Sequence, residues 1–78
     1  MNHKTTADER FLKKLYELTE GKTYVDVNYL KVGKLVGMKE TATTTIVKAL
    51  AQSNFIKKMS DTHIRITERG CAFVQENS

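Results

Sequence analysis

The sequence contains no proline, no tryptophan and a single cysteine, Cys71. One thiol excludes an intrachain disulfide and a cage of cysteines around a metal ion. No apolar run approaches the roughly 18 residues that a transmembrane helix requires. The first five residues lead into a charged segment and not into an apolar one. We therefore expect no membrane span and no secretory signal, and a reducing, cytoplasmic location.

The length of 78 residues allows one domain, which we predict over residues 6–76 behind a tail at 1–5. A chain of this size buries only about 60–65% of its unfolded surface. It has little volume for a deep pocket, so we expect no cofactor and no small-molecule ligand. His3 lies in the tail, and His63 has no second ligand at metal spacing. The sequence does not pair a nucleophile with a base, and we therefore expect this protein to have no enzymatic activity.

The net charge of +4 comes from 13 basic and 9 acidic side chains. Residues 1–28 carry five of each sign, and residues 68–78 carry one more acidic than basic side chain. The whole surplus therefore falls in residues 29–67, where seven basic side chains face two acidic ones. A solvated surface would also explain the lysines. A surplus confined to one segment favours an anionic partner such as nucleic acid.

Hydrophobic periodicity and turn residues predict seven elements. In chain order these are a helix at 6–20, a strand at 22–27, helices at 29–36 and 39–52, strands at 55–59 and 63–67, and a helix at 68–75. Thr6 and Glu9 fit a capping box at the start of the first helix. Phe11, Leu15 and Leu18 then repeat at helical spacing and predict its core stripe.

The segment 39–52 is rich in β-branched residues, which would favour a strand on propensity alone. At about 100° per residue, however, its apolar side chains separate from its polar ones. The predicted core side comprises Ala42, Thr43, Ile46, Val47, Ala49 and Leu50. The outer side comprises Thr41, Thr44, Thr45, Lys48 and Gln52. The preceding helix has its own apolar face, at Val32, Leu35 and Val36.

The stretch 27–56 resembles the winged helix-turn-helix family in the spacing of its small and apolar residues. Counted from the turn glycine, Gly37, a small residue stands four earlier at Gly33. The family's apolar positions around this glycine are occupied by Val32, Val36, Met38, Ile46, Val47 and Leu50. Asn54 stands where the family has a glycine, and it can adopt the left-handed conformation. The run at 66–70, Ile-Thr-Glu-Arg-Gly, resembles the family's Leu-Thr-Glu-x-Gly, so the likeness covers residues 6–75.

Two residues depart from the family's pattern. Thr43 stands where an apolar β-branched residue is usual, so its hydroxyl needs a backbone acceptor. Lys39 stands where the family prefers a serine or threonine cap, which leaves the start of that helix less defined. The resemblance still implies a mostly α fold with a small β-hairpin wing. This is an α+β winged helix of order α-β-α-α-β-β-α around a three-helix core.

In this family the helix after the turn enters the DNA major groove, and the hairpin lies along an adjacent groove or the backbone. The resemblance implies a sequence-specific, double-stranded DNA-binding transcriptional regulator. We expect a homodimer that contacts its copy through Leu12 and Tyr16 of the first helix, with completion of the core by these two side chains as the alternative. The residues that fall by position on the DNA surface are Lys31, Lys34, Lys39, Glu40, Thr41, Thr44, Thr45, Lys48, Lys57, Lys58, His63 and Arg65.

The resemblance also implies roles for these residues. Glu40 could accept a hydrogen bond from a cytosine amino group. The threonine hydroxyls can bond bases or phosphates, and their methyls can touch thymine methyls. Phosphate contacts are implied for Lys39, Lys57, Lys58 and Arg65, and for the two lysines of the preceding helix. Arg65 or His63 could also enter the minor groove.

Winged helices also serve as protein-interaction or RNA-binding modules, and the fold alone leaves this alternative open. A protein-binding module tends to expose apolar or acidic residues on the helix after the turn. This chain is predicted to expose threonine and lysine there, which favours DNA. The threonines could also be no more than a tolerated polar face.

Overall fold

The computed structural model describes residues 6–77, so the predicted tail at 1–5, with His3, lies outside the described residues. The elements in chain order are α1 (Ala7–Thr19), β1 (Val27–Asn28), α2 (Tyr29–Leu35), α3 (Glu40–Gln52), β2 (Ile56–Lys58), β3 (His63–Ile66) and α4 (Glu68–Glu76). The predicted order of elements is confirmed. The fold is a mixed α+β fold in which helices pack against a small antiparallel sheet.

Helix α1 begins with the predicted capping box. The Thr6 hydroxyl accepts from the Glu9 amide at 3.2 Å, and the Glu9 carboxylate accepts from the Thr6 amide at 2.8 Å. The helix ends at its C-cap, Glu20, which has a left-handed φ of 56°, and Gly21 follows with a φ of 74°. Leu18 is 40% exposed, so its predicted place in the core stripe is wrong. The buried stripe is centred on Leu12, Leu15 and Thr19, and Leu18 falls on its border.

The sheet has the strand order β1-β3-β2, with β3 in the middle. Val27 pairs with Ile64 on one side of β3, and Ile56 pairs with Ile66 on the other. The predicted first strand at 22–27 is wrong over most of its length, because only Val27–Asn28 pair with β3. The segment before it forms turns instead, and its Tyr24 is 67% exposed.

Helices α2 and α3 cross closely at Gly33, which is buried. A Cβ at this position would overlap the hydroxyl of Thr43 and lie 2.8 Å from its Cγ2. Thr43 is 1% exposed, and its hydroxyl donates to the Lys39 carbonyl at 2.9 Å. The backbone acceptor that the sequence analysis required for Thr43 is therefore present. Gly37, with a φ of 76°, reverses the chain between the two helices.

Three further residues that were predicted to face the core are exposed: Leu35, Ala42 and Ala49. The buried side of α2 is centred on Val32 and Gly33, so the end of this short helix turns Leu35 outward. Both alanines lie at the borders of the buried stripe of α3, where a small side chain does not reach the core. Asn54 has a φ of 64°, as predicted for a residue in place of glycine.

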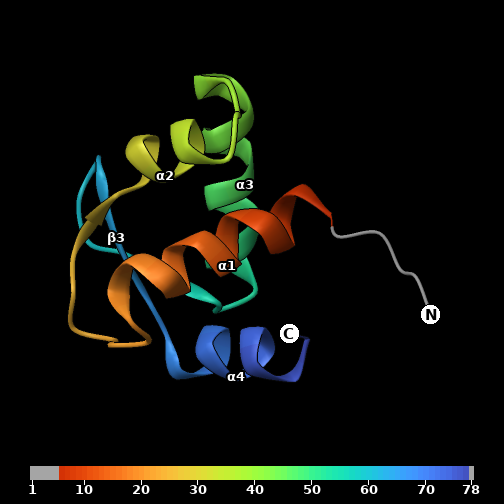
Figure 1. The fold of residues 1–78 in the computed structure, drawn as a ribbon. Coiled ribbons are helices and arrows are strands. Elements are labelled where there is room, and N and C mark those ends of the chain that lie inside the picture. Colours follow the sequence, from red (N-terminus) through yellow and green to blue (C-terminus); the bar gives the residue numbers. More distant parts are fainter. Residues whose placement is uncertain (1–5, 78) are drawn as a thin grey trace.

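Helix α1 runs across the middle of the molecule, with α2 and α3 on one side and α4 on the other (Figure 1). The core draws on all four helices and on the sheet. Its members are Phe11, Leu12, Leu15, Tyr29, Val32, Ile46, Val47, Leu50, Ile56, Ile64, Ile66, Cys71 and Val74. The predicted three-helix core therefore also includes α4. Within residues 6–77, no helix is both long and apolar enough to cross a bilayer.

Burial decides one partner prediction directly. Leu12 is 1% exposed and packs inside the core, so it offers no surface to a second copy of the chain. Its predicted dimer contact is wrong for this reason. Tyr16 is half-buried, and its hydroxyl accepts a hydrogen bond from the side-chain amide of Gln75 at 3.2 Å. A homodimer through Tyr16 stays a prediction.

Candidate nucleic-acid interface

The outer side of α3 is a polar stripe that no other element covers. It comprises Thr41, Thr44, Thr45, Lys48 and Gln52, and we call it the α3 stripe. All five side chains are exposed, whereas Thr43, Ile46, Val47 and Leu50 on the other side of the helix are buried. The predicted separation of the two sides is thus present, and the stripe can be approached along its length.

Two hydroxyls of the stripe are turned back onto their own helix. Thr44 donates to the Glu40 carbonyl at 2.9 Å, and Thr45 donates to the Thr41 carbonyl at 3.0 Å. Threonine commonly makes this bond to the carbonyl four residues earlier in a helix. The hydroxyl proton is then in use. The oxygen can still accept a hydrogen bond, and the methyl group remains.

The start of α3 adjoins a surface hollow of about 390 Å³. Its lining residues are Leu30, Lys34, Met38, Lys39, Glu40 and Thr43. Lys39 occupies the N-cap and makes no side-chain capping hydrogen bond, as its departure from the family pattern predicted. The hollow thus joins two lysines, one from α2 and one from the start of α3. Lys31 lines a different hollow, together with Leu18 and Asp26.

The basic residues of the two hairpin strands lie on both faces of the sheet. Lys57 pairs with Arg65, and Lys58 pairs with Ile64. Directly opposed side chains share one face of an antiparallel pair, and Ile64 is fully buried on the core face. Lys57, Arg65 and His63 are therefore on the outer face, away from the helices. The predicted DNA residues fall on two surfaces, the α2–α3 side and the outer sheet face.

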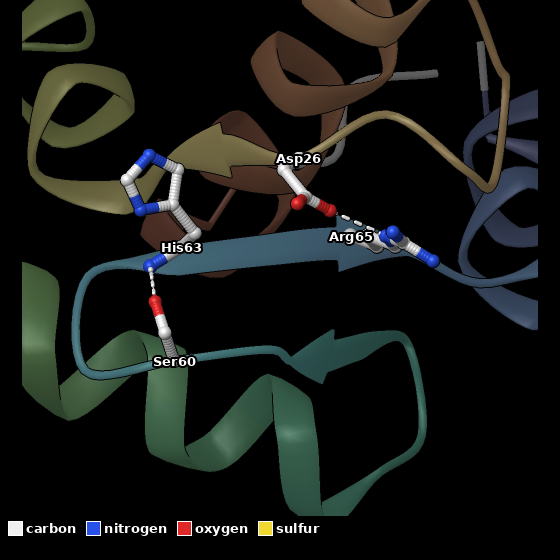
Figure 2. Close-up of polar contacts among 4 residues, drawn as sticks. All are labelled: Asp26, Ser60, His63 and Arg65. Carbon is white, nitrogen blue, oxygen red and sulfur yellow. Dashed lines mark hydrogen bonds and ion pairs between the residues drawn. The ribbon is translucent and has the colours of Figure 1, made fainter.

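Arg65 has a partner that the sequence analysis missed. Its guanidinium Nε donates to a carboxylate oxygen of Asp26, the residue just before β1 (Figure 2). The side chains are 35% and 48% exposed, so solvent reaches the pair. Val27 pairs with Ile64, and one step along the register sets Asp26 opposite Arg65. The only signal in the sequence was the alternation of His63, Ile64 and Arg65, which fixes faces but not partners.

The hairpin tip, residues 59–62, is tied to the start of α2. The Tyr29 hydroxyl donates to the Asp61 carbonyl at 2.7 Å, and the Tyr29 amide donates to the Thr62 carbonyl at 2.9 Å. Within the tip, the Ser60 hydroxyl accepts from the His63 amide at 3.1 Å (Figure 2). Tyr29 is 8% exposed, so a core residue anchors the tip. The hairpin is thereby held in a fixed position relative to α2.

Within residues 6–77, six lysines of the segment 29–67 make no ion pair. In the described part of the chain, ion pairs join Lys14 to Glu17, Lys22 to Glu20 and Arg65 to Asp26. The lysines outside these pairs in residues 29–67 are Lys31, Lys34, Lys39, Lys48, Lys57 and Lys58, and all of them are exposed. Their charge is not neutralised by a neighbouring carboxylate, so it is available to an anionic partner.

Residues 6–77 contain no group of three or more histidine, cysteine or acidic side chains placed to hold a metal ion. Cys71 is buried and directs its thiol to the Gly21 carbonyl at 3.3 Å. Burial raises the pKa of this thiol, and the nearby Glu68 carboxylate raises it further. The thiol is therefore protonated at neutral pH, as expected for a small packing side chain and not for a nucleophile.

Comparison with known proteins leaves the family of the chain open. No family model, no curated protein and no solved structure matches it.

Proposed function

We propose that this chain is a sequence-specific, double-stranded DNA-binding module of the winged-helix type and acts as a transcriptional regulator. The observation that carries the proposal is the α3 stripe, an uncovered helix face of threonine and lysine within a segment of unpaired lysines. An α-helix with side chains is about 10–12 Å wide, which fits the major groove of B-DNA at about 12 Å. In this proposal α3 lies in that groove.

The winged-helix assignment has its support in the region around α2 and α3. Two helices cross at a glycine, turn at a left-handed glycine and are followed by a short hairpin. The tip of that hairpin is anchored to α2 through Tyr29. An anchored hairpin has little freedom to lose on binding, which favours its use as a wing beside the recognition helix. The wing would lie along the backbone or the minor groove.

Phosphate contacts would fix the module on the duplex while α3 reads base edges. Lys34 and Lys39 flank the hollow at the start of α3, where the first-turn amides add a partial positive charge. Lys58 and Lys48 lie further along the same segment and are exposed. Lys57 and Arg65 lie on the outer face of the sheet. They would contact DNA phosphates only where the duplex extends past the edge of the hairpin. Arg65 would first have to leave Asp26.

Two rival functions require other surfaces. The cores of protein-protein interfaces are enriched in aromatic residues, methionine and arginine and depleted in lysine, whereas the α3 stripe consists of threonine, lysine and glutamine. Double-stranded RNA has a deep and narrow major groove that does not admit a helix. The exposed lysines outside these ion pairs could also contact RNA phosphates. The experiment therefore has to distinguish DNA binding from RNA binding.

The test is a fluorescence anisotropy titration of the chain with a random-sequence DNA duplex at low and at moderate salt. A matched RNA duplex provides the comparison. The proposal predicts saturable DNA binding at low salt that weakens steeply as salt is raised, and weaker binding to the RNA duplex. Absence of DNA binding at low salt, binding that does not depend on salt, or tighter binding to RNA would each overturn it.

A further inference from the structure

We infer that the α3 stripe recognises the C5-methyl groups of pyrimidines in the major groove, so that the preferred DNA is rich in thymine. This inference rests on the proposed DNA-binding function and adds the chemistry of the sequence that is read. It follows from the side chains that the stripe contains and from the direction of their hydroxyl protons.

The hydroxyl protons of Thr44 and Thr45 are already used in hydrogen bonds. Thr44 and Thr45 donate to carbonyls of their own helix at 2.9 and 3.0 Å. A phosphate oxygen is only an acceptor, so these hydroxyls would have to break an existing hydrogen bond before they could bind one. What both side chains present to a groove without rearrangement is a methyl group and an acceptor oxygen.

The α3 stripe lacks most of the side chains that usually read guanine and adenine. Guanine is read most often by a bidentate arginine or lysine, and adenine by a bidentate asparagine or glutamine. The stripe contains no arginine or asparagine, and its single glutamine, Gln52, is the last residue of the helix. Lys48 is its only cation. Lys48 is therefore the only side chain near the middle of the stripe that could read guanine.

The methyl groups of the α3 stripe match the apolar group that thymine presents in the major groove. Thr41, Thr44 and Thr45 place three methyl-bearing side chains within five residues on one face of α3, and the exposed Ala42 adds a fourth methyl beside them. The thymine C5-methyl is the apolar group that the major groove presents, and threonine methyls and alanine are its usual contacts. The threonine oxygens can accept from the amino group of adenine or of cytosine, so they do not distinguish the base pairs. The methyl contacts are therefore what favours A·T pairs.

The experiment changes only the methyl group of the DNA. Binding is measured for an A·T-rich duplex, for the same duplex with deoxyuridine in place of thymidine, and for a G·C duplex with cytosine or 5-methylcytosine. Loss of the methyl should weaken binding by about threefold to fourfold for each methyl buried against the protein. The 5-methylcytosine duplex should bind more tightly than the cytosine duplex.

Protein variants then assign the effect to the stripe. The double variant Thr44→Ser/Thr45→Ser keeps both hydroxyls and removes both methyls. It should lose part of the discrimination between the thymidine and deoxyuridine duplexes, because Thr41 and Ala42 keep their methyls. Thr23→Ser, the same change in the exposed segment before β1, should keep the discrimination of the unchanged protein.

The outcomes separate this inference from the proposed function. Binding to the thymidine duplex with no loss on deoxyuridine substitution would overturn the inference alone and leave DNA binding intact. Discrimination that is undiminished in the double serine variant would equally overturn it, because the methyls would then be read elsewhere. Failure to bind any duplex at low salt would overturn both proposals.

Discussion

The guanidinium of Arg65 is held by the carboxylate of Asp26 across two neighbouring strands of the sheet. Both side chains are more than one-third exposed, and an ion pair of this kind stabilises a fold by only about 0–1 kcal/mol. The pair therefore contributes little to folding, and under the proposed DNA-binding function its effect would be to hold back Arg65. As long as Arg65 is bound to Asp26, its charge is partly neutralised and its Nε donor is occupied.

Removal of the Asp26 carboxylate should therefore improve DNA binding. In Asp26→Asn we expect a tighter complex at low salt and a salt dependence steeper by about 0.9, the value for one additional phosphate contact. The free energy of unfolding should change by less than about 1 kcal/mol. Anisotropy titrations over a salt series and urea unfolding measure the two quantities.

Two controls accompany the Asp26 variant. Glu76→Gln removes one negative charge at the end of α4 and should leave the slope of the salt dependence unchanged. Asp26→Asn/Arg65→Gln removes the freed cation and should lose the gain. A gain in the double variant as large as that in Asp26→Asn would show that Arg65 is not the residue released.

The close crossing of α2 and α3 makes Gly33 sensitive to one added methyl. Gly33→Ala should destabilise the fold by about 1–3 kcal/mol, because the new Cβ would overlap the Thr43 hydroxyl. Urea unfolding of Gly33→Ala, Thr43→Ala and the double variant forms a thermodynamic cycle. The double variant should be more stable than the sum of the single losses predicts. Additive losses would contradict the crossing, as would an unchanged stability of Gly33→Ala.

The buried thiol predicts a pH dependence of stability. The pKa of Cys71 is raised above its ordinary value of 9.0, chiefly by burial and further by Glu68. The folded state thus favours the protonated thiol. The resulting stabilisation is complete below the pKa of the unfolded thiol and is lost as the pH rises through the pKa of the folded one.

The measurement is urea unfolding at neutral pH and at a pH above 9.0. The unchanged protein should lose more stability between the two conditions than Cys71→Ala, which has no thiol to ionise. Any other effect of pH on stability is shared by both proteins and cancels in the comparison. If both proteins lost the same amount, the pKa of Cys71 would not be raised in the fold.

The local features of the fold were accessible from the sequence. Capping at Thr6 and the helical period of the threonine-rich segment depend on neighbours within a few residues, and the structure confirms both. The same is true of the left-handed Asn54 and of the acceptor for Thr43. The role of Gly33 was implied by the resemblance to the winged helix-turn-helix pattern, which has a small residue four positions before the turn glycine.

The features that the sequence did not reveal depend on contacts between distant segments. The partner of Arg65 is 39 positions away, and the residue that anchors the hairpin tip, Tyr29, is 32 positions from Asp61. Sequence alternation assigns side chains to faces, but it does not set the register between strands. The errors at Leu18 and Leu35 have a related cause. Both lie at the border of an apolar stripe, where the packing of neighbouring elements decides burial.

The central claim is that the α3 stripe lies in the DNA groove, and charge reversal at Lys48 tests it most directly. If about five basic side chains neutralise phosphates, the slope of log K against log salt should be about −4 to −5. Lys48→Glu should weaken binding and reduce the magnitude of that slope by about one or more. Its thermal midpoint should be nearly unchanged, since Lys48 is exposed and makes no ion pair within residues 6–77.

Lys13→Glu is the matched control, because it makes the same charge change on an exposed residue of α1. The account predicts that Lys13→Glu keeps the slope of the unchanged protein, whereas Lys48→Glu does not. Equal affinities and slopes for the two variants would contradict it and move the DNA surface away from α3.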